Sequence, residues 1–186
     1  MKNVFITGAS RGLGLQILKE MLCNGWNVYC ISRTVPEPLR KILDTNENVH
    51  HMVYDLEDAV SIKEEIFKKF IPNKIPIHAC VHNSAVAYDD IITNLNLKKL
   101  NKMYNINVIS VMTINKFIIR NMLLNKTRGS IVHISSISAT TGFKGLSMYA
   151  STKGAIEALS NNIAREWGSR GIRSNCVVPG FMETSM

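Results

Sequence analysis

A glycine-rich turn near the N-terminus constrains the fold of this chain more than any other feature. Residues 7–14 read Thr-Gly-Ala-Ser-Arg-Gly-Leu-Gly. A strand rich in β-branched and aromatic residues is expected over residues 2–7, and apolar residues at helical spacing run from about Gly12 to Cys23. The turn therefore lies between the first strand and the first helix, a position at which parallel α/β proteins hold anions.

Each glycine of the turn has a physical purpose. Gly8 permits a tight turn, Gly12 lets the backbone approach a pyrophosphate, and Gly14 lets the helix pack close to the sheet. The spacing differs from the commonest dinucleotide fingerprint, and such turns also have purely structural roles, yet the position favours a dinucleotide site. The residues predicted to bind it are Gly8, Ser10, Arg11, Gly12, Leu13 and Gly14.

Strands and helices alternate along the rest of the chain. Further strands are expected over residues 27–32, 49–54, 77–82, 129–135 and 173–178, which makes six in all. A short helix is expected after Pro38 to about residue 43, and a second from a capping box at Ser61, or from an earlier start near Asp58, to Phe70. Two longer helices are expected over residues 97–124 and 147–167. This alternation predicts an α/β fold with a doubly wound, Rossmann-like parallel sheet. A length of 186 residues suits one domain, so residues 1–186 are expected to form a single unit.

The end of the second strand predicts the type of dinucleotide. NAD-specific sites place Asp or Glu about 20 residues after the glycines, where it holds the ribose 2′-hydroxyl. Here Arg33 stands 19 residues after Gly14, and the nearest acidic residue downstream, Glu37, lies in a loop. A guanidinium suits a 2′-phosphate, and Arg11 would add a second cation. We therefore expect NADP(H), although both arginines also suit an ordinary surface.

Tyr149 and Lys153 form the pair best suited to chemistry. They stand four residues apart early in an expected helix, which places both side chains on one face. A free phenol has a pKa of about 10 and is a poor acid–base catalyst at neutral pH. A nearby ammonium, and the positive charge of an oxidised nicotinamide, would lower that pKa. Tyr149 is thus predicted to exchange a proton with a carbonyl oxygen, although most isolated pairs of this kind are solvated helix faces.

Two further residues are candidates for the same site. Ser136 follows the fifth expected strand, where a parallel sheet presents its ligands, and is predicted to hydrogen-bond a substrate carbonyl. Asn107 lies inside the long expected helix and is predicted to bind a water linked to Lys153, opening a proton path to solvent. The alternative is that Asn107 is a satisfied polar residue in a helix interface.

With these residues in place, the chain resembles the short-chain dehydrogenase/reductase family, in its Tyr-x-x-x-Lys branch. The resemblance covers essentially the whole chain, and its combination of motifs is highly specific. The 13-residue interval between Ser136 and Tyr149 favours Ser136 over Ser135. The motifs are Thr7–Gly14, Asp55-Leu56, Asn83-Ser84-Ala85, Asn107, Ser136, Tyr149, Lys153, and Pro179-Gly180 with Thr184.

The resemblance implies a role for each of these positions. Asn107, Ser136, Tyr149 and Lys153 would form a catalytic tetrad, in which Lys153 also binds the nicotinamide ribose. The adenine would lie between Asp55 and Leu56, and Asn83 with Ser84 and Ala85 would shape the cofactor groove. The nicotinamide end would be lined by Val178, Pro179, Gly180 and Thr184. The resemblance also implies NADP(H), and a homodimer or homotetramer built through the long helices.

The sequence departs from the family pattern at two places. Ala85 stands where the family usually has glycine, a change that narrows the backbone choices without being expected to inactivate the protein. Family members also continue past the position of Met186 into a substrate-covering lid and a seventh strand. We expect that this sequence omits such a tail; the alternative is an open pocket with a bare sheet edge.

Composition and charge narrow the partners. The formal net charge is +8, yet no long Lys/Arg run and no aromatic–basic interleaving is present, so a basic surface is favoured over a nucleic-acid partner. The N-terminus lacks a signal-peptide layout, no apolar stretch approaches a membrane span, and the four cysteines form no C-x-x-C pair, which favours the cytoplasm. His78, Cys80 and His82 share a strand face, but packing is favoured there over a metal site, and no metal is expected.

The leading hypothesis is an NADPH-dependent oxidoreductase that reduces a ketone to a secondary alcohol. The run from Val178 to Thr184 resembles that of 3-oxoacyl-[acyl-carrier-protein] reductases, and the basic charge would suit an acidic carrier. Candidate docking residues are Lys126, Arg128, Arg170 and Arg173. The alternatives are a sugar, polyol or secondary-metabolite ketone reductase, or a non-catalytic NADP-binding regulatory subunit. A sugar-nucleotide epimerase is disfavoured, because its turn has a different glycine spacing and its chain a longer C-terminal domain.

Overall fold

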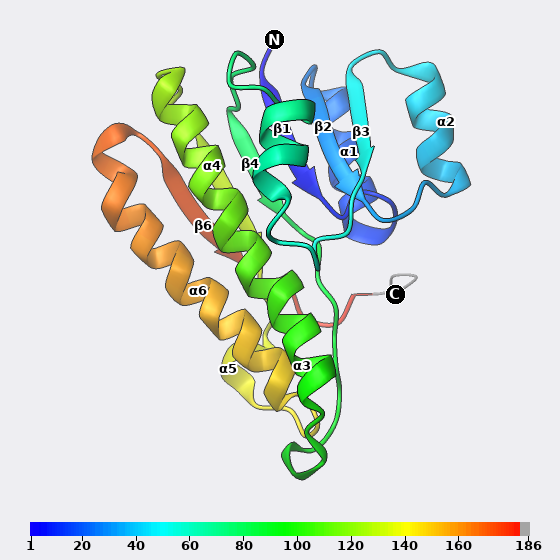
Figure 1. Cartoon of the computed structure of the whole chain (residues 1–186), viewed down its shortest axis with the longest axis vertical. Helices are drawn as coiled ribbons and strands as arrows, with labels where there is room; N and C mark the ends of the chain where they lie inside the picture. The colour runs from blue at the N-terminus through cyan, green and yellow to red at the C-terminus, as the bar shows by residue number, and fades with distance from the viewer. Residues whose placement is uncertain (183–186) are drawn as a thin grey trace.

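The computed structural model of the chain describes residues 1–182 and contains a six-stranded parallel sheet (Figure 1). The strand order is β3-β2-β1-β4-β5-β6. The strands are β1 (Asn3–Thr7), β2 (Asn27–Ser32), β3 (Val49–Val53), β4 (Ala79–His82), β5 (Ser130–Ile134) and β6 (Arg173–Val177). The chain reverses its direction of travel across the sheet between β1 and β4, which creates the crevice where such sheets bind ligands. The predicted doubly wound α/β class is confirmed.

Helices connect successive strands. On one face lie α1 (Gly12–Cys23) and α2 (Glu37–Thr45), and on the other lie η1 (Lys63–Phe70), α4 (Ser110–Leu124) and α6 (Ser147–Trp167). The segments α3 (Leu97–Tyr104) and η3 (Asn105–Ile109) run directly into α4, and this long rod lies beside α6 (Figure 1). The shorter helical segments are η2 (Ile92–Asn94), α5 (Ser138–Thr141) and η4 (Gly168–Arg170).

Two apolar cores hold these layers together. Val4 and Ile6 of β1 point to the α1–α2 face, whereas Phe5 points to the opposite face, packed against η1 and α4. The alternation along β1 therefore contributes to both cores, and all five of its residues are buried, as expected of a central parallel strand. This central strand ends at Thr7, directly before the glycine-rich turn, so the turn is fixed to the most rigid part of the sheet.

Two local predictions are corrected by the structure. The expected capping box at Ser61 does not form: the helix begins at Lys63 without a side-chain cap, and the Asp58 carboxylate accepts the Ser61 N–H instead. The helix expected over residues 97–124 is continuous but contains a π-helical turn at Asn105–Ile109, and such turns often mark functional sites. Among the described residues, no helix is long and apolar enough to span a bilayer, and no three His, Cys, Asp or Glu side chains are grouped to hold a metal.

Candidate active site

The glycine-rich turn is a tight cradle in which side chains have no room at Gly8 and Gly14. Gly8 and Gly12 adopt positive φ angles of 73° and 52°, a region that favours glycine. A Cβ on Gly14 would lie 2.1 Å from the Gly8 carbonyl oxygen and 2.5 Å from Asn83 Nδ2, closer than any real contact. Gly14 thus lets α1 pack directly against Gly8 and Asn83, and the start of α1 has no side-chain cap, so its backbone N–H groups can face an anion.

A hydrogen-bond network ties this turn to the end of β4. Thr7 Oγ1 accepts the backbone N–H groups of Asn83 and Ser84, both at 3.1 Å, and Asn83 Nδ2 donates to the Gly8 carbonyl at 3.0 Å. These contacts span the crevice between β1 and β4. Ala85, the departure from the family pattern, has a negative φ, so its methyl group is accommodated without backbone strain.

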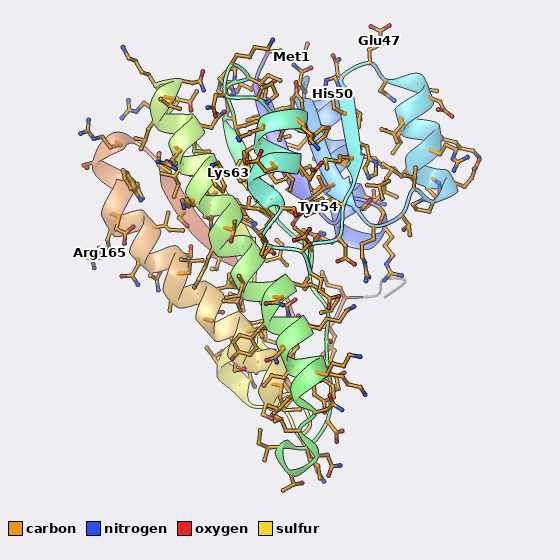
Figure 2. The ribbon with its side chains drawn as sticks, viewed as in Figure 1. Met1, Glu47, His50, Tyr54, Lys63 and Arg165 are labelled. Carbon is orange, nitrogen blue, oxygen red and sulfur yellow. The ribbon has the colours of Figure 1, made fainter. Side chains whose placement is uncertain are left out.

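A pocket of about 340 Å³ opens at the carboxyl end of β2 and β3. It is lined by Arg33, Val53, Tyr54, Asp55 and Asp58. Tyr54, labelled in Figure 2, lies just beyond β3, and its hydroxyl donates to the Asp58 carbonyl at 2.5 Å. Leu56 is buried in the apolar core, so of the two residues expected to flank the adenine only Asp55 lines the pocket.

The cations expected at the ribose phosphate are both exposed to solvent. Arg33 follows β2 at the pocket, and Arg11 stands at the N-cap of α1. A pocket with an arginine at its rim, next to a glycine cradle that leaves a helix N-terminus open, fits a dinucleotide with an extra phosphate.

Asn107 is buried in the π-helical turn, and its side chain is fully engaged. Its Oδ1 accepts the Val86 N–H at 2.9 Å, while Nδ2 donates to the Val86 carbonyl at 2.8 Å and to Thr152 Oγ1 at 3.1 Å. The side chain therefore fixes the segment after β4 to α6, which corresponds to the satisfied-residue alternative. A water linked to Lys153 would therefore have to be bound by groups other than this amide.

The two serines after β5 have different partners. Ser135 Oγ donates to the Glu157 carboxylate at 2.6 Å, so its hydroxyl is committed to α6. Ser136 Oγ instead accepts hydrogen bonds from the Ser138 N–H and hydroxyl, at 3.2 and 2.9 Å. The Ser136 hydroxyl proton remains available for a substrate oxygen. This difference supports the choice of Ser136 made from the sequence interval.

Lys153 lies inside the protein, on the turn of α6 that follows Tyr149. It is 5% exposed, its Nζ donates to the Ile134 carbonyl at 2.8 Å, and it lies 5.5 Å from the centroid of the Tyr149 ring. Since Ile134 ends β5 two residues before Ser136, this contact brings the lysine to the serine's end of the strand. Burial lowers the pKa of Lys153 to about 8.

The pKa of Tyr149 is raised, opposite to the direction expected from the sequence. Burial of the half-buried phenol is the larger cause, and the Asp89 carboxylate acts in the same direction. Lys153, which the Ile134 carbonyl holds over the ring, is not among the causes of this shift. The protein without cofactor therefore keeps Tyr149 protonated, as a proton donor requires.

The segment after β6 reaches the same edge of the sheet. The Pro179 carbonyl accepts the Ile137 N–H at 3.1 Å, and Gly180 lies 3.7 Å from the Ile137 side chain, measured from its would-be Cβ. Pro179 and Gly180 are thus next to Ser136, as expected for residues at the nicotinamide end. Thr184, also expected there, lies outside the described residues.

Sequence reasoning missed the residues that connect the site. Thr152 Oγ1 donates to the Tyr149 carbonyl at 2.7 Å and accepts from Asn107, and Val86 holds both ends of the Asn107 amide. Thr152 lies directly before Lys153 in the motif, so a polar residue there was a visible but ambiguous signal. Val86 contributes only backbone groups, which no residue pattern reveals.

Comparison with known proteins agrees with this geometry. The sequence profile described as short chain dehydrogenase matches residues 2–186. The chain is 32% identical to a 3-oxoacyl-[acyl-carrier-protein] reductase of Buchnera aphidicola and 29% identical to an L-xylulose reductase of Caenorhabditis elegans. These alignments cover 99% and 100% of the chain, and 75% and 73% of the relatives.

Solved structures give the same result. The structure of ElxO with NADP bound has a TM-score of 0.86 and 31% identity, covering 99% of this chain and 75% of that one. A parallel sheet with this crevice, cradle and Tyr–Lys pair defines a dinucleotide-binding oxidoreductase acting on CH–OH or C=O groups. The chain belongs to the short-chain dehydrogenase family. The NADP(H) expected from Arg33 agrees with the cofactor bound in ElxO.

Proposed function

We propose that this protein is an NADPH-dependent carbonyl reductase in which Tyr149 donates the proton. The observation that carries this proposal is the placement of a buried ammonium, Lys153, beside the Tyr149 ring at the carboxyl end of β5. The raised pKa of Tyr149 keeps its hydroxyl protonated at rest, which suits reduction of a ketone to a secondary alcohol. The reverse reaction requires Tyr149 to lose that proton.

The residues of the cradle and pocket would hold the cofactor. The backbone from Gly8 to Gly14 would face the pyrophosphate, Arg33 and Arg11 the 2′-phosphate, and Asp55 the adenine. Lys153 has N–H groups beyond the one given to Ile134, which suit ribose hydroxyls. When bound, NADPH supplies the hydride that reduces a carbonyl carbon.

The protein's own residues would control the carbonyl oxygen. The free hydroxyl proton of Ser136 would donate to that oxygen and orient it, and Tyr149 would transfer its phenolic proton there. The Lys153 ammonium would then stabilise the phenolate that remains. Asn107 would contribute as a positioning residue, because its amide holds the Val86 backbone and Thr152 together around the lysine.

The substrate class that the comparisons favour is a 3-oxoacyl group on a carrier protein, because several relatives at about 30% identity are reductases of that kind. However, the proposed docking residues do not suit it. Arg128 precedes β5 and Arg173 begins β6, at the amino ends of the strands, whereas the site lies at the carboxyl ends. Lys126 and Arg170 also precede β5 and β6, so they too lie at the amino ends of the strands, away from the site. A sugar or polyol ketone, as reduced by the L-xylulose reductase relative, is the second candidate.

A homo-oligomer is the assembly that the surface supports. Leu97, Ile109 and Met112 on the α3–α4 rod are exposed, and a groove of about 550 Å³ crosses its α3–η3 part. Exposed apolar side chains grouped on helices favour burial against another copy of the chain. Light scattering coupled to size-exclusion chromatography should give a dimer or tetramer mass, and a concentration-independent monomer would contradict it.

The cytoplasm is the compartment that we propose. All four cysteines are free thiols in the structure, and Cys30 and Cys80 are buried. Reduced thiols without disulfides are typical of a reducing compartment. Microscopy of the fluorescently tagged protein in its host cell would test this proposal, and a signal confined to membranes or outside the cell would contradict it.

Turnover of NADPH tests the proposed function. The protein would be incubated with NADPH and a panel of 3-oxoacyl thioesters, sugar ketones and polyol-derived ketones, and the loss of nicotinamide absorbance would be followed. Consumption of NADPH with one class identifies the substrate, and the Tyr149→Phe variant should slow that consumption at least about 100-fold. Binding of NADPH without turnover of any ketone would instead support the regulatory-subunit alternative.

A further inference from the structure

A pair of buried histidines lies in the sheet behind Lys153. His82 of β4 and His133 of β5 are register partners, and their rings stack with centroids 4.9 Å apart and an angle of 7° between planes. The side chains are 4% and 0% exposed, respectively. Imidazole is rarely buried so completely without a reason, because its nitrogens require hydrogen-bond partners.

Most polar atoms of this cluster have no partner among the described residues. His82 Nε2 lies 2.8 Å from Asn115 Oδ1 of α4 and 3.4 Å from Cys80 Sγ of β4. Because an amide oxygen only accepts, Nε2 carries the hydrogen and Nδ1 is left as a bare acceptor. Asn115 Nδ2 and both ring nitrogens of His133 are also buried without a protein partner. Leaving each such atom unpaired costs about 1–3 kcal/mol, so four atoms in one interface call for another group.

The unpaired atoms include both donors and acceptors. Asn115 Nδ2 donates, His82 Nδ1 accepts, and the neutral His133 ring has one nitrogen of each kind. Burial, with smaller contributions from His82 and the Lys153 cation, lowers the pKa of His133 to about 2, so this ring stays uncharged. Water, with two donors and two acceptor sites, satisfies such a mixed set, and internal waters typically make about three hydrogen bonds.

Lys153 is the ammonium next to this cluster. His133 directly precedes Ile134, whose carbonyl accepts from Lys153 Nζ at 2.8 Å, and the charge of the lysine acts on the His133 ring. The Ile134 contact is the one hydrogen bond of Lys153 within residues 1–182, which leaves N–H groups for other acceptors. The other titratable groups around Lys153 and the histidines are Tyr149 and Glu157 on α6, Cys80 on β4, Cys176 on β6, and Asp89 after β4.

We propose that His82, His133 and Asn115 bind internal water, and that this water accepts a hydrogen bond from the Lys153 ammonium. The histidines then act as positioning residues: they keep an acceptor beside the lysine and favour its charged form. The role in catalysis rests on the function proposed above, whereas the water site and its effect on Lys153 do not.

Titration of Lys153 by NMR in the protein without cofactor tests the site directly. In His133→Leu the acceptor is lost, and the pKa of Lys153 should fall by about one pH unit, as expected when a charged group loses one hydrogen bond. In His133→Asn an amide oxygen can still accept from water, so the value should return toward that of the unaltered protein. The matched control is His50→Leu at the exposed start of β3, labelled in Figure 2, which should leave the pKa of Lys153 unchanged. An unchanged or raised pKa of Lys153 in His133→Leu would overturn the proposal.

A second measurement needs no variant and covers the case in which His133→Leu fails to fold. A high-resolution crystal structure of the unaltered protein should show ordered water within hydrogen-bond distance of a His133 nitrogen, and a dry interface there would refute the site. The basic limb of the pH profile of kcat/KM should follow the Lys153 pKa across the variants.

If the water and the titration behave as expected but no ketone is reduced, the proposed function fails and the water site stands. If ketone is reduced but the interface is dry, the reverse holds.

Discussion

The Lys153 ammonium lies 5.5 Å from the centroid of the Tyr149 ring, one turn further along α6, and the Ile134 carbonyl holds it there. The lysine thus reaches from a helix to the end of β5, where it meets the residues around Ser136. Helix and sheet jointly fix the distance between the cation and the phenol. Burial also lowers the pKa of Lys153 to about 8, which is close to the pH range in which enzymes work.

The rate of reduction should therefore fall in mild alkali. Burial lowers the pKa of Lys153 to about 8, so its positive charge is lost as the pH rises through that value. Because kcat/KM reports the groups of the free enzyme, its profile should show a basic limb near pH 8. In Lys153→Arg the cation persists at any accessible pH, so the limb should disappear even if the rate is lower. A wild-type profile that stays flat to about pH 10, the ordinary range of lysine, would contradict this interpretation.

The cradle predicts a large difference between two glycine substitutions. Gly14→Ala would place a Cβ 2.1 Å from the Gly8 carbonyl, so the turn must shift and the Asn83–Gly8 bond must weaken. The free energy of unfolding should fall by about 1–3 kcal/mol, and NADPH affinity with it. The control is Gly154→Ala in α6, where no atom lies within 4 Å of the new Cβ, and this change should be neutral or stabilise by about 0.5–1 kcal/mol. Urea unfolding of both variants would measure the difference, and equal effects would argue against the cradle.

Arg33 should decide between the two nicotinamide cofactors. Removing one charge-assisted hydrogen bond to the 2′-phosphate in Arg33→Ala should raise the Kd for NADPH about 10- to 100-fold. The Kd for NADH should not change, because that cofactor lacks the phosphate. Arg40→Ala, which replaces another exposed arginine, on α2, serves as the control. Isothermal titration calorimetry gives both constants, and a parallel loss of NADH affinity would show that Arg33 supports the fold of the pocket instead.

The buried histidines should make the protein sensitive to acid. Burial lowers the pKa of His82 to about 4, below its value of about 6.5 in the unfolded chain, so the unfolded state binds more protons between these values. The contribution of neutral His82 to the free energy of unfolding is therefore fully present above pH 6.5. It decreases by about 3 kcal/mol as the pH falls toward 4. His133 acts in the same direction. Urea midpoints measured between these two pH values should follow this course in the wild type and flatten in His82→Asn/His133→Asn; an identical slope in the double variant would contradict the assignment.

Much of the fold could be predicted because its signals are local. The periodicity of Gly12–Cys23 and Ser147–Trp167 gave both helices with the bounds that the structure shows, and the glycines at 8, 12 and 14 marked the turn between β1 and α1. The Ser61 capping box does not form because the Asp58 carboxylate accepts the Ser61 N–H. The spacing of residues alone cannot tell which nearby carboxylate will accept that N–H. The π-helical turn around Asn107 also escaped prediction, since it depends on the fit of the long rod against α6 and the Val86 backbone.

The electrostatics of the site were harder to predict than its residues. The sequence interval selected Ser136 over Ser135, and the contacts of Ser135 with Glu157 support that choice. The direction of the Tyr149 pKa was predicted incorrectly, because the sequence shows the neighbouring lysine but not the burial of the phenol. The stacking of His82 on His133 depends on the register of β4 with β5, which no local pattern specifies.

The most direct test of the account compares turnover and cofactor binding in Tyr149→Phe. The substitution removes one hydroxyl and leaves the ring beside Lys153, so NADPH should bind with unchanged Kd while kcat for the reduced ketone falls about 100- to 10,000-fold. Fluorescence titration of NADPH and steady-state kinetics on the same preparation give both values. Undiminished turnover in this variant would contradict the assignment of Tyr149 as the proton donor.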